Sequence, residues 1–167
     1  MADLKRKYLL VGAALAAFAA VLAYVMAQAP APAGPQSLVD AMAALVGLTA
    51  IVWFLMVIYR NLAFIRGIAT ERYYEAYTVQ APPEWVERPA RTYMNLLELP
   101  LLFYVACLLM ITNGRVDSVQ VSLAWLFVAT RYAHAVLYIG FNYVPLRFAA
   151  FASGAITLAI FWARLVG

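Results

Sequence analysis

Five long apolar runs dominate this chain and limit the folds that it can adopt. In chain order they are Tyr8–Met26, Ala41–Tyr59, Thr92–Thr112, Val121–Phe141 and Val144–Ala163. Each is close to the roughly 20 residues that a helix needs to cross the hydrocarbon core of a bilayer. Their apolarity is continuous and does not alternate, which favours helices over the strands of a membrane barrel. The sequence therefore predicts an all-α integral membrane protein with five spans.

The composition agrees with this prediction. Hydrophobic residues make up 66% of the 167 residues and charged residues only 12%, and the mean hydropathy is +0.82. These values lie outside the range of soluble domains, and the loops are too short to hold one. The single Cys107 lies within an apolar run and there is one histidine. We therefore expect neither a disulfide framework nor a metal site.

The first apolar run has two possible interpretations. The basic segment 5–7 precedes it and small residues around Ala27 follow it, as in a secretory signal peptide. The run is longer than the apolar core of about 7–15 residues in such peptides, which favours a retained helix. We expect residues 1–36 to form an extra transmembrane helix with a Pro/Ala-rich linker, and residues 37–167 a four-helix transmembrane domain.

The basic residues predict the orientation of the spans, because cytoplasmic loops carry an excess of Lys and Arg. With the N-terminus inside, only Arg115 and Arg164 lie on the outer side. The inner side carries Lys5, Arg6, Lys7, Arg60, Arg66, Arg72, Arg88, Arg91 and Arg147. The net charge of +4 is thus explained by topology, and we do not expect nucleic-acid binding.

Two of the spans carry polar residues at helical spacing. The third contains Arg91, Asn95 and Glu98, and the fourth contains Arg131, His134 and Tyr138. Each set lines one helix face, and both lie at comparable depth near the cytoplasmic boundary. Polar residues in a bilayer usually face a bundle interior or a wet cavity and indicate a functional site. We therefore predict one shared pocket.

Charge pairing and ligand type can also be predicted for this pocket. An unpaired buried charge costs several kcal/mol, so we expect Glu98 to pair with Arg131 or with an arginine at the pocket mouth. The arginines expected at the mouth are Arg60, Arg88, Arg91 and Arg147. A guanidinium binds carboxylates through two parallel hydrogen bonds, so this ring indicates an anionic ligand.

Two separated motifs resemble one known family. The first is Pro82–Glu98, with Arg91, Asn95 and Glu98 at its core and Pro100 after it; the second is Arg131–Tyr138, followed by Pro145 and Arg147. Together they resemble the membrane-associated proteins in eicosanoid and glutathione metabolism, the MAPEG family. The second motif is similar to its microsomal prostaglandin E synthase branch. The resemblance covers about residues 40–167 and indicates a bacterial-type member with an extra N-terminal span.

The resemblance implies a four-helix transmembrane bundle of the MAPEG type, assembled as a homotrimer in the bacterial inner membrane. It implies glutathione bound between neighbouring subunits near the cytoplasmic side, and a lipophilic co-substrate that arrives from membrane lipid. Arg147 would be the catalytic residue that stabilises the glutathione thiolate. The implied ligand-binding residues are Arg60, Arg91, Asn95, Glu98, Arg131, His134 and Tyr138. The chain differs from the family pattern at Met94, Phe148 and Phe151, where members have Arg, Ser and Tyr.

Three functions are compatible with the sequence. The first is a glutathione-dependent transferase or peroxidase that acts on lipophilic electrophiles. The second is a non-catalytic MAPEG-fold protein that binds a lipid or another anionic amphiphile, which Met94 and Phe148 favour. The third is a small transporter or proton-relay protein that uses Glu98, Arg131 and His134.

Overall fold

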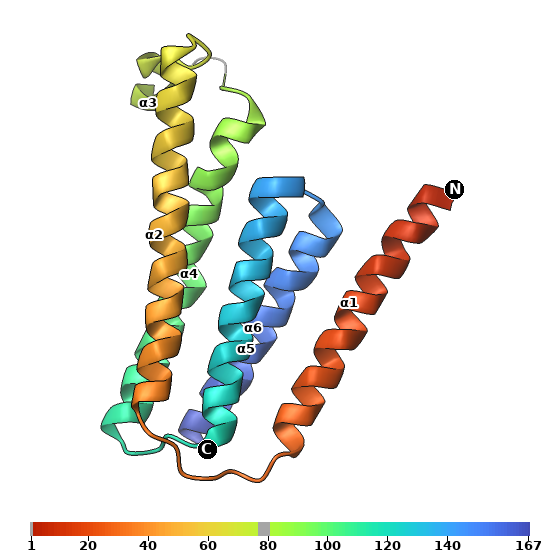
Figure 1. Ribbon diagram of the computed structural model, residues 1–167, viewed down its shortest axis with the longest axis vertical. Coiled ribbons are helices and arrows are strands. Elements are labelled where there is room, and N and C mark those ends of the chain that lie inside the picture. Colours follow the sequence, from red (N-terminus) through yellow and green to blue (C-terminus); the bar gives the residue numbers. More distant parts are fainter. Residues whose placement is uncertain (1, 77–80) are drawn as a thin grey trace.

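Two pairs of long helices, α2 with α4 and α5 with α6, form the centre of the molecule (Figure 1). The computed structural model describes residues 2–76 and 81–167. Its elements are α1 (Ala2–Ala27), α2 (Gln36–Ile65), α3 (Glu71–Ala76), α4 (Glu84–Thr112), α5 (Ser118–Val136), the π-helical turn η1 (Leu137–Phe141) and α6 (Val144–Val166). Five of these helices, counting α5 and η1 as one, are long and apolar enough to cross a membrane. The predicted all-α, five-span fold is therefore confirmed.

Two helices extend further than their apolar runs predict. Helix α4 begins at Glu84, not at Thr92, and α2 covers residues 36–65, not 41–59. The first turns of α4 combine charged residues with the fully buried Val86, and Arg88 pairs with Glu84 one turn earlier at 3.2 Å. Such a pair stabilises the exposed surface of a helix where no long apolar run indicates it. Apolarity thus marks the part of a helix inside the membrane and not the whole helix.

The core between the helices is aromatic. The Phe103 ring of α4 stacks on the Phe127 ring of α5 with centroids 4.8 Å apart. The Phe161 ring of α6 lies 5.7 Å from the Phe103 ring. All three side chains are fully buried. Because lipid gives helices no hydrophobic reason to associate, close packing of this kind has to hold them together.

Hydrogen bonds join the linker, the α4–α5 turn and the end of α6 at one end of the bundle. Asp117 caps α5 by accepting from the backbone N–H of Gln120 at 2.8 Å, and it pairs with Arg164 of α6 at 3.0 Å. The N–H of Ser118 donates to the carbonyl of Ala31 in the linker at 2.8 Å. The N-terminus and η1 lie at the opposite end (Figure 1).

Helix α1 stands apart from the other four long helices. It packs against α5 and α6, and most of its described side chains are exposed. Figure 1 shows it at the edge of the molecule, on the far side from α2 and α4. Its faces are therefore available to lipid or to another molecule.

The contact between α5 and α6 depends on a buried arginine and a glycine. The Arg131 side chain is 1% exposed, and its Nη2 donates to the carbonyls of Ala150 at 3.2 Å and Phe151 at 2.9 Å. The chain leaves room for this guanidinium at Gly154. A Cβ there would overlap Nη2 of Arg131 and lie 2.6 Å from Oγ1 of Thr130.

We predict that Gly154→Ala destabilises the protein. Because Arg131 is enclosed and held by two hydrogen bonds, it cannot move aside easily, and overpacking of this kind costs about 1–3 kcal/mol. The measurement is thermal unfolding in detergent. Gly12→Ala is the control, because a Cβ at Gly12 meets nothing within 4 Å. Equal melting temperatures for the two variants would contradict the described packing.

Candidate functional site

A pocket of about 250 Å³ lies between α4, the α5–η1 segment and α6. Its lining residues are Asn95, His134, Tyr138, Val144, Arg147, Phe148 and Phe151. Four of the residues predicted from the sequence therefore meet here: one from α4, two from α5 and η1, and Arg147 from α6. Their roles toward a ligand stay a prediction.

The chain reversal after α5 positions the pocket. The last turn before the loop is the π-helical segment Leu137–Phe141, a local form that is frequent at functional sites. Asn142 follows with a φ of 46°, a left-handed conformation that asparagine tolerates better than most residues. Pro145 then lies in the first turn of α6, where its missing N–H removes no helical hydrogen bond. Arg147 is thereby placed beside Tyr138 of η1.

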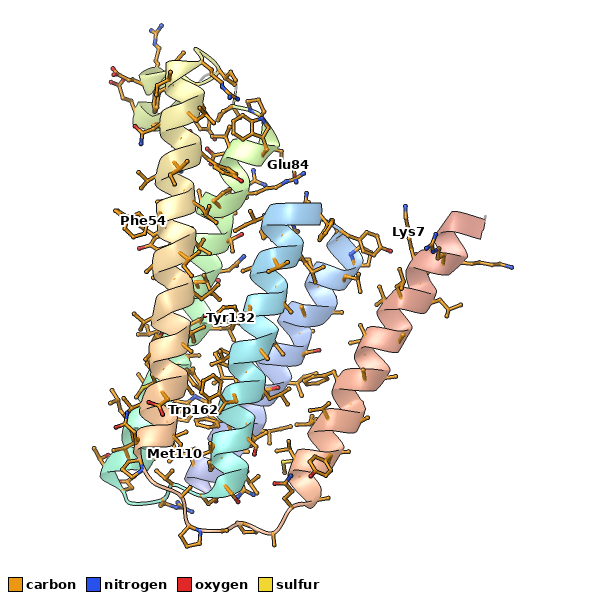
Figure 2. The ribbon with its side chains drawn as sticks, viewed as in Figure 1. Lys7, Phe54, Glu84, Met110, Tyr132 and Trp162 are labelled. Atoms are coloured by element: carbon orange, nitrogen blue, oxygen red, sulfur yellow. The ribbon has the colours of Figure 1, made fainter. Side chains whose placement is uncertain are left out.

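Arg147 is held by two contacts that leave its charge available. Its Cζ lies 3.9 Å from the centre of the Tyr138 ring, and its Nη1 donates to Oδ1 of Asn142 at 2.6 Å. The Asn142 amide in turn donates to Glu84, which Figure 2 shows at the start of α4. Glu84 also accepts from Arg88. Within residues 2–76 and 81–167, no carboxylate lies within ion-pair distance of Arg147, so the cation can bind an anion.

Aromatic rings form part of the pocket wall. The His134 ring lies 5.9 Å from the Tyr138 ring and 5.8 Å from the Phe151 ring. Behind this wall, Cζ of Arg131 lies 5.1 Å from the Phe151 ring and 5.4 Å from the Phe127 ring. Arg131 therefore supports Phe151 and is not among the residues that line the pocket.

The predicted pairing of Glu98 is wrong. Arg131 donates to carbonyls of α6 instead, and no ion pair of Glu98 occurs in the described part of the chain. Of the three predicted residues of α4, only Asn95 lines the pocket, while Arg91 and Glu98 are exposed on the same helix face. A proton relay through Glu98, Arg131 and His134 gains no support, because no hydrogen bond joins these side chains among the described residues.

Arg60 belongs to a separate cluster at the end of α2. It lies 3.8 Å from Glu87, and its Cζ is 4.8 Å from the centre of the Tyr74 ring. The Tyr74 hydroxyl donates to Glu87 at 3.1 Å, and burial, together with the Glu87 carboxylate, raises the pKa of Tyr74 to about 12. Of the four arginines predicted at the mouth, only Arg147 lines the pocket, and Arg60 and Arg88 are in ion pairs.

Two residues of the site were missed from the sequence. Asn142 and Glu84 contribute to holding Arg147, although neither belongs to the polar helix faces. Their signals were local: an asparagine between an apolar span and Pro145, and a carboxylate four residues before Arg88. These signals indicate a turn at Asn142 and an ion pair on the surface of α4. They do not indicate that the two residues contact each other, which only the structure shows.

Comparison with known proteins identifies the family. A family model described as the MAPEG family matches residues 38–167, which include α2, α4, α5, α6 and nearly all of the described chain beyond α1. The chain belongs to the MAPEG family. No match was found among curated proteins or among solved structures. The resemblance inferred from the two motifs is thereby confirmed, and this MAPEG chain is an integral, multi-pass membrane protein of a generally glutathione-associated family.

We predict that Asn142→Gly loosens the site without misfolding it. Glycine accepts the positive φ but removes the link between Arg147 and Glu84, and each lost hydrogen bond costs about 1 kcal/mol. Amides of residues 137–147 should exchange with deuterium about fivefold faster, as measured by mass spectrometry. Asn113→Gly, at the opposite end of the bundle, is the matched control and should leave this segment unchanged. Unaltered exchange in Asn142→Gly would argue against the link.

Proposed function

We propose that this MAPEG protein binds glutathione in the Arg147 pocket and uses its thiolate against lipophilic electrophiles, as a transferase or peroxidase. The observation that carries the proposal is the arginine itself. Arg147 is fixed over Tyr138 and by Asn142 but has no ion-pair partner in the described part of the chain. A cation in such a place favours the ionised thiol, and the thiolate is the nucleophile.

The other polar groups fit the remaining parts of glutathione. Asn95 and His134 line the pocket and can form hydrogen bonds with the peptide groups. Arg91 and Glu98 flank Asn95 on the exposed face of α4. Arg91 can pair with a carboxylate of glutathione, and Glu98 with its ammonium group. Glutathione carries all of these groups, so the donors and acceptors of the site suit it.

A second copy of the chain would complete the site. The pocket of about 250 Å³ is smaller than most sites for molecules of this size, which measure roughly 300–1,000 Å³. Arg91 and Glu98 are exposed in the single chain, and charges that face lipid are costly. Covering this face of α4 with a neighbouring subunit removes the cost and encloses the ligand. We therefore propose the homotrimer that the family resemblance implies.

The lipophilic electrophile would approach along the apolar rim of the pocket. Val144 and Phe148 lie on this rim, and Phe148 is 69% exposed. An apolar molecule dissolved in the membrane can contact these side chains before it reaches the thiolate. The thiol proton leaves to water when the thiolate forms. In a substitution, the thiolate sulfur bonds to the electrophilic carbon as the bond to the leaving group breaks, and that group departs with the electron pair. In an addition, a π bond of the electrophile breaks instead, and the neighbouring atom takes a proton from water.

A second function rests on the same apolar rim. Phe148 of this rim follows Arg147 in the sequence, and Met94, which precedes Asn95 and lies outside the pocket lining, is 60% exposed. This combination of an available cation and apolar side chains also suits an anionic amphiphile that is bound and not converted. Binding of a long-chain carboxylate that excess glutathione does not displace would favour this alternative.

We predict that glutathione bound to the purified protein ionises. Titration near pH 7 in detergent should give a saturable ultraviolet thiolate absorbance, and Arg147→Ala should reduce it at least about tenfold, because one unit of thiol acidity is a factor of ten. Arg66→Ala is the control, since Arg66 is exposed and lies outside the pocket. An undiminished signal in Arg147→Ala would remove Arg147 from this role, and no signal in the folded wild type would reject the proposal.

We place the N-terminus and the Arg147 pocket on the cytoplasmic side of a bacterial inner membrane. The support is the distribution of basic residues, most of which lie toward the end of the bundle that carries the pocket, whereas Arg115 and Arg164 contact groups at the other end. Five spans then leave the C-terminus on the opposite side.

We predict that reporter fusions give this orientation. Alkaline phosphatase fused after Gly167 should be active, and the same enzyme fused after Arg66, between α2 and α3, should be inactive, because the enzyme needs the oxidising periplasm. Green fluorescent protein fused at these two positions should give the opposite pattern. Reversed activities would place the pocket on the outer side.

A further inference from the structure

We propose that the protein has a second ligand site, a pocket between α1 and the α5–α6 pair that holds one acyl chain of an anionic membrane lipid. The pocket has a volume of about 190 Å³. Leu15 and Phe18 of α1 form one wall, and Ala133, Leu146 and Ala149 of α5 and α6 contribute to the other. This proposal is independent of glutathione chemistry.

The acyl-chain pocket is separate from the Arg147 pocket. The two share no lining residue. Both use α6, but residues 146, 149, 150 and 153 line the acyl-chain pocket, whereas Val144, Arg147, Phe148 and Phe151 line the other. At 100° per residue these sets lie on largely opposite faces of the helix. A ligand in one pocket therefore does not occupy the other.

The lining selects hydrocarbon over water. An apolar protein cavity of about 150 Å³ stays dry and binds a molecule of the size of benzene, and this pocket is larger at about 190 Å³. Thr130 and Ser153 bring hydroxyl groups to an otherwise apolar lining, and the Thr130 hydroxyl already donates to the carbonyl of Phe127 at 2.7 Å. Small side chains at Ala133 and Ala149 leave the space between the helices unfilled. A flexible acyl chain can fill it and bring α1 into closer contact with the bundle.

Charge at the N-terminal end of α1 indicates the headgroup. Lys5 and Arg6 are exposed there, and Figure 2 labels Lys7 at the same end of the helix. Phe18 lies about 16 Å further along α1, counted from Lys7 at 1.5 Å per residue. The hydrocarbon of one leaflet is about 15 Å thick. A lipid with its headgroup beside these basic residues thus reaches the pocket with its acyl chain, and the positive charge favours an anionic headgroup.

Native mass spectrometry of the detergent-purified protein tests the proposal, with phosphatidylglycerol and phosphatidylcholine of equal chain length as probes. Wild type should retain one phosphatidylglycerol per chain and at least fivefold less phosphatidylcholine. Ala14→Phe fills the pocket and should reduce retained phosphatidylglycerol at least fivefold. Ala16→Phe is the matched control, because Ala16 is exposed and does not line the pocket, and it should behave as wild type.

The double variant Lys5→Gln/Arg6→Gln leaves the pocket intact and should lower the retention of phosphatidylglycerol to that of phosphatidylcholine. It keeps the proposal testable even where Ala14→Phe does not fold. Equal retention by Ala14→Phe and Ala16→Phe would overturn the acyl-chain pocket. Equal retention of the two lipids by wild type, or no effect of the double variant, would overturn the headgroup preference. Glutathione-induced thiolate absorbance is a separate readout and should be the same in all these variants.

Discussion

The guanidinium of Arg131 joins α5 to α6, and the geometry of the Arg147 pocket depends on that junction. Its hydrogen bonds to the carbonyls of Ala150 and Phe151 fix how far α6 is rotated and advanced relative to α5. Two of its nitrogens, Nε and Nη1, are buried without a hydrogen-bond partner among the described residues, which is costly in a low-dielectric interior. Gly154 supplies the space that this arrangement needs. The same rotation turns Arg147 and Phe151 toward His134 and Tyr138.

The π-helical turn and Asn142 also determine the geometry of the pocket, together with Arg131. A regular α-helix through residues 137–141 would change the direction of the following side chains, since a π-turn contains an additional residue. The left-handed Asn142 then closes the reversal, and its side chain contacts both Arg147 and Glu84. Helix α4, which carries the first sequence motif, is thus connected to Arg147, which follows the second motif. This connection joins the two motifs in space at the pocket.

Much of the fold could be predicted from the sequence. A membrane span needs about 20 consecutive apolar residues, and its backbone must form its hydrogen bonds within the helix, so composition alone indicates each span. The polar helix faces also identified Asn95, His134 and Tyr138, which line one pocket together with Arg147, an arginine predicted at the mouth. The errors came from side-chain partners. Periodicity places Arg91, Asn95 and Glu98 on one face of α4, but it does not say how that face is turned toward α5, and so the partner assigned to Glu98 was wrong. Arg131 donates to backbone carbonyls of α6 instead. Every residue has a backbone carbonyl, so a sequence does not indicate which one will accept.

Helix α1 has a consequence for the insertion of the chain into a membrane. It precedes the other four long helices in the sequence, and an earlier span of a membrane protein usually influences the orientation of those that follow. Its basic start and long apolar run form a strong insertion signal, whereas α4, with Arg91 and Glu98 near one end, is a weaker one. Once α1 is inserted, each later helix crosses in an alternating sense without having to determine its own direction. A chain with such an insertion signal tolerates Arg91 and Glu98 in α4, and α1, which carries the signal, contributes no residue to the Arg147 pocket.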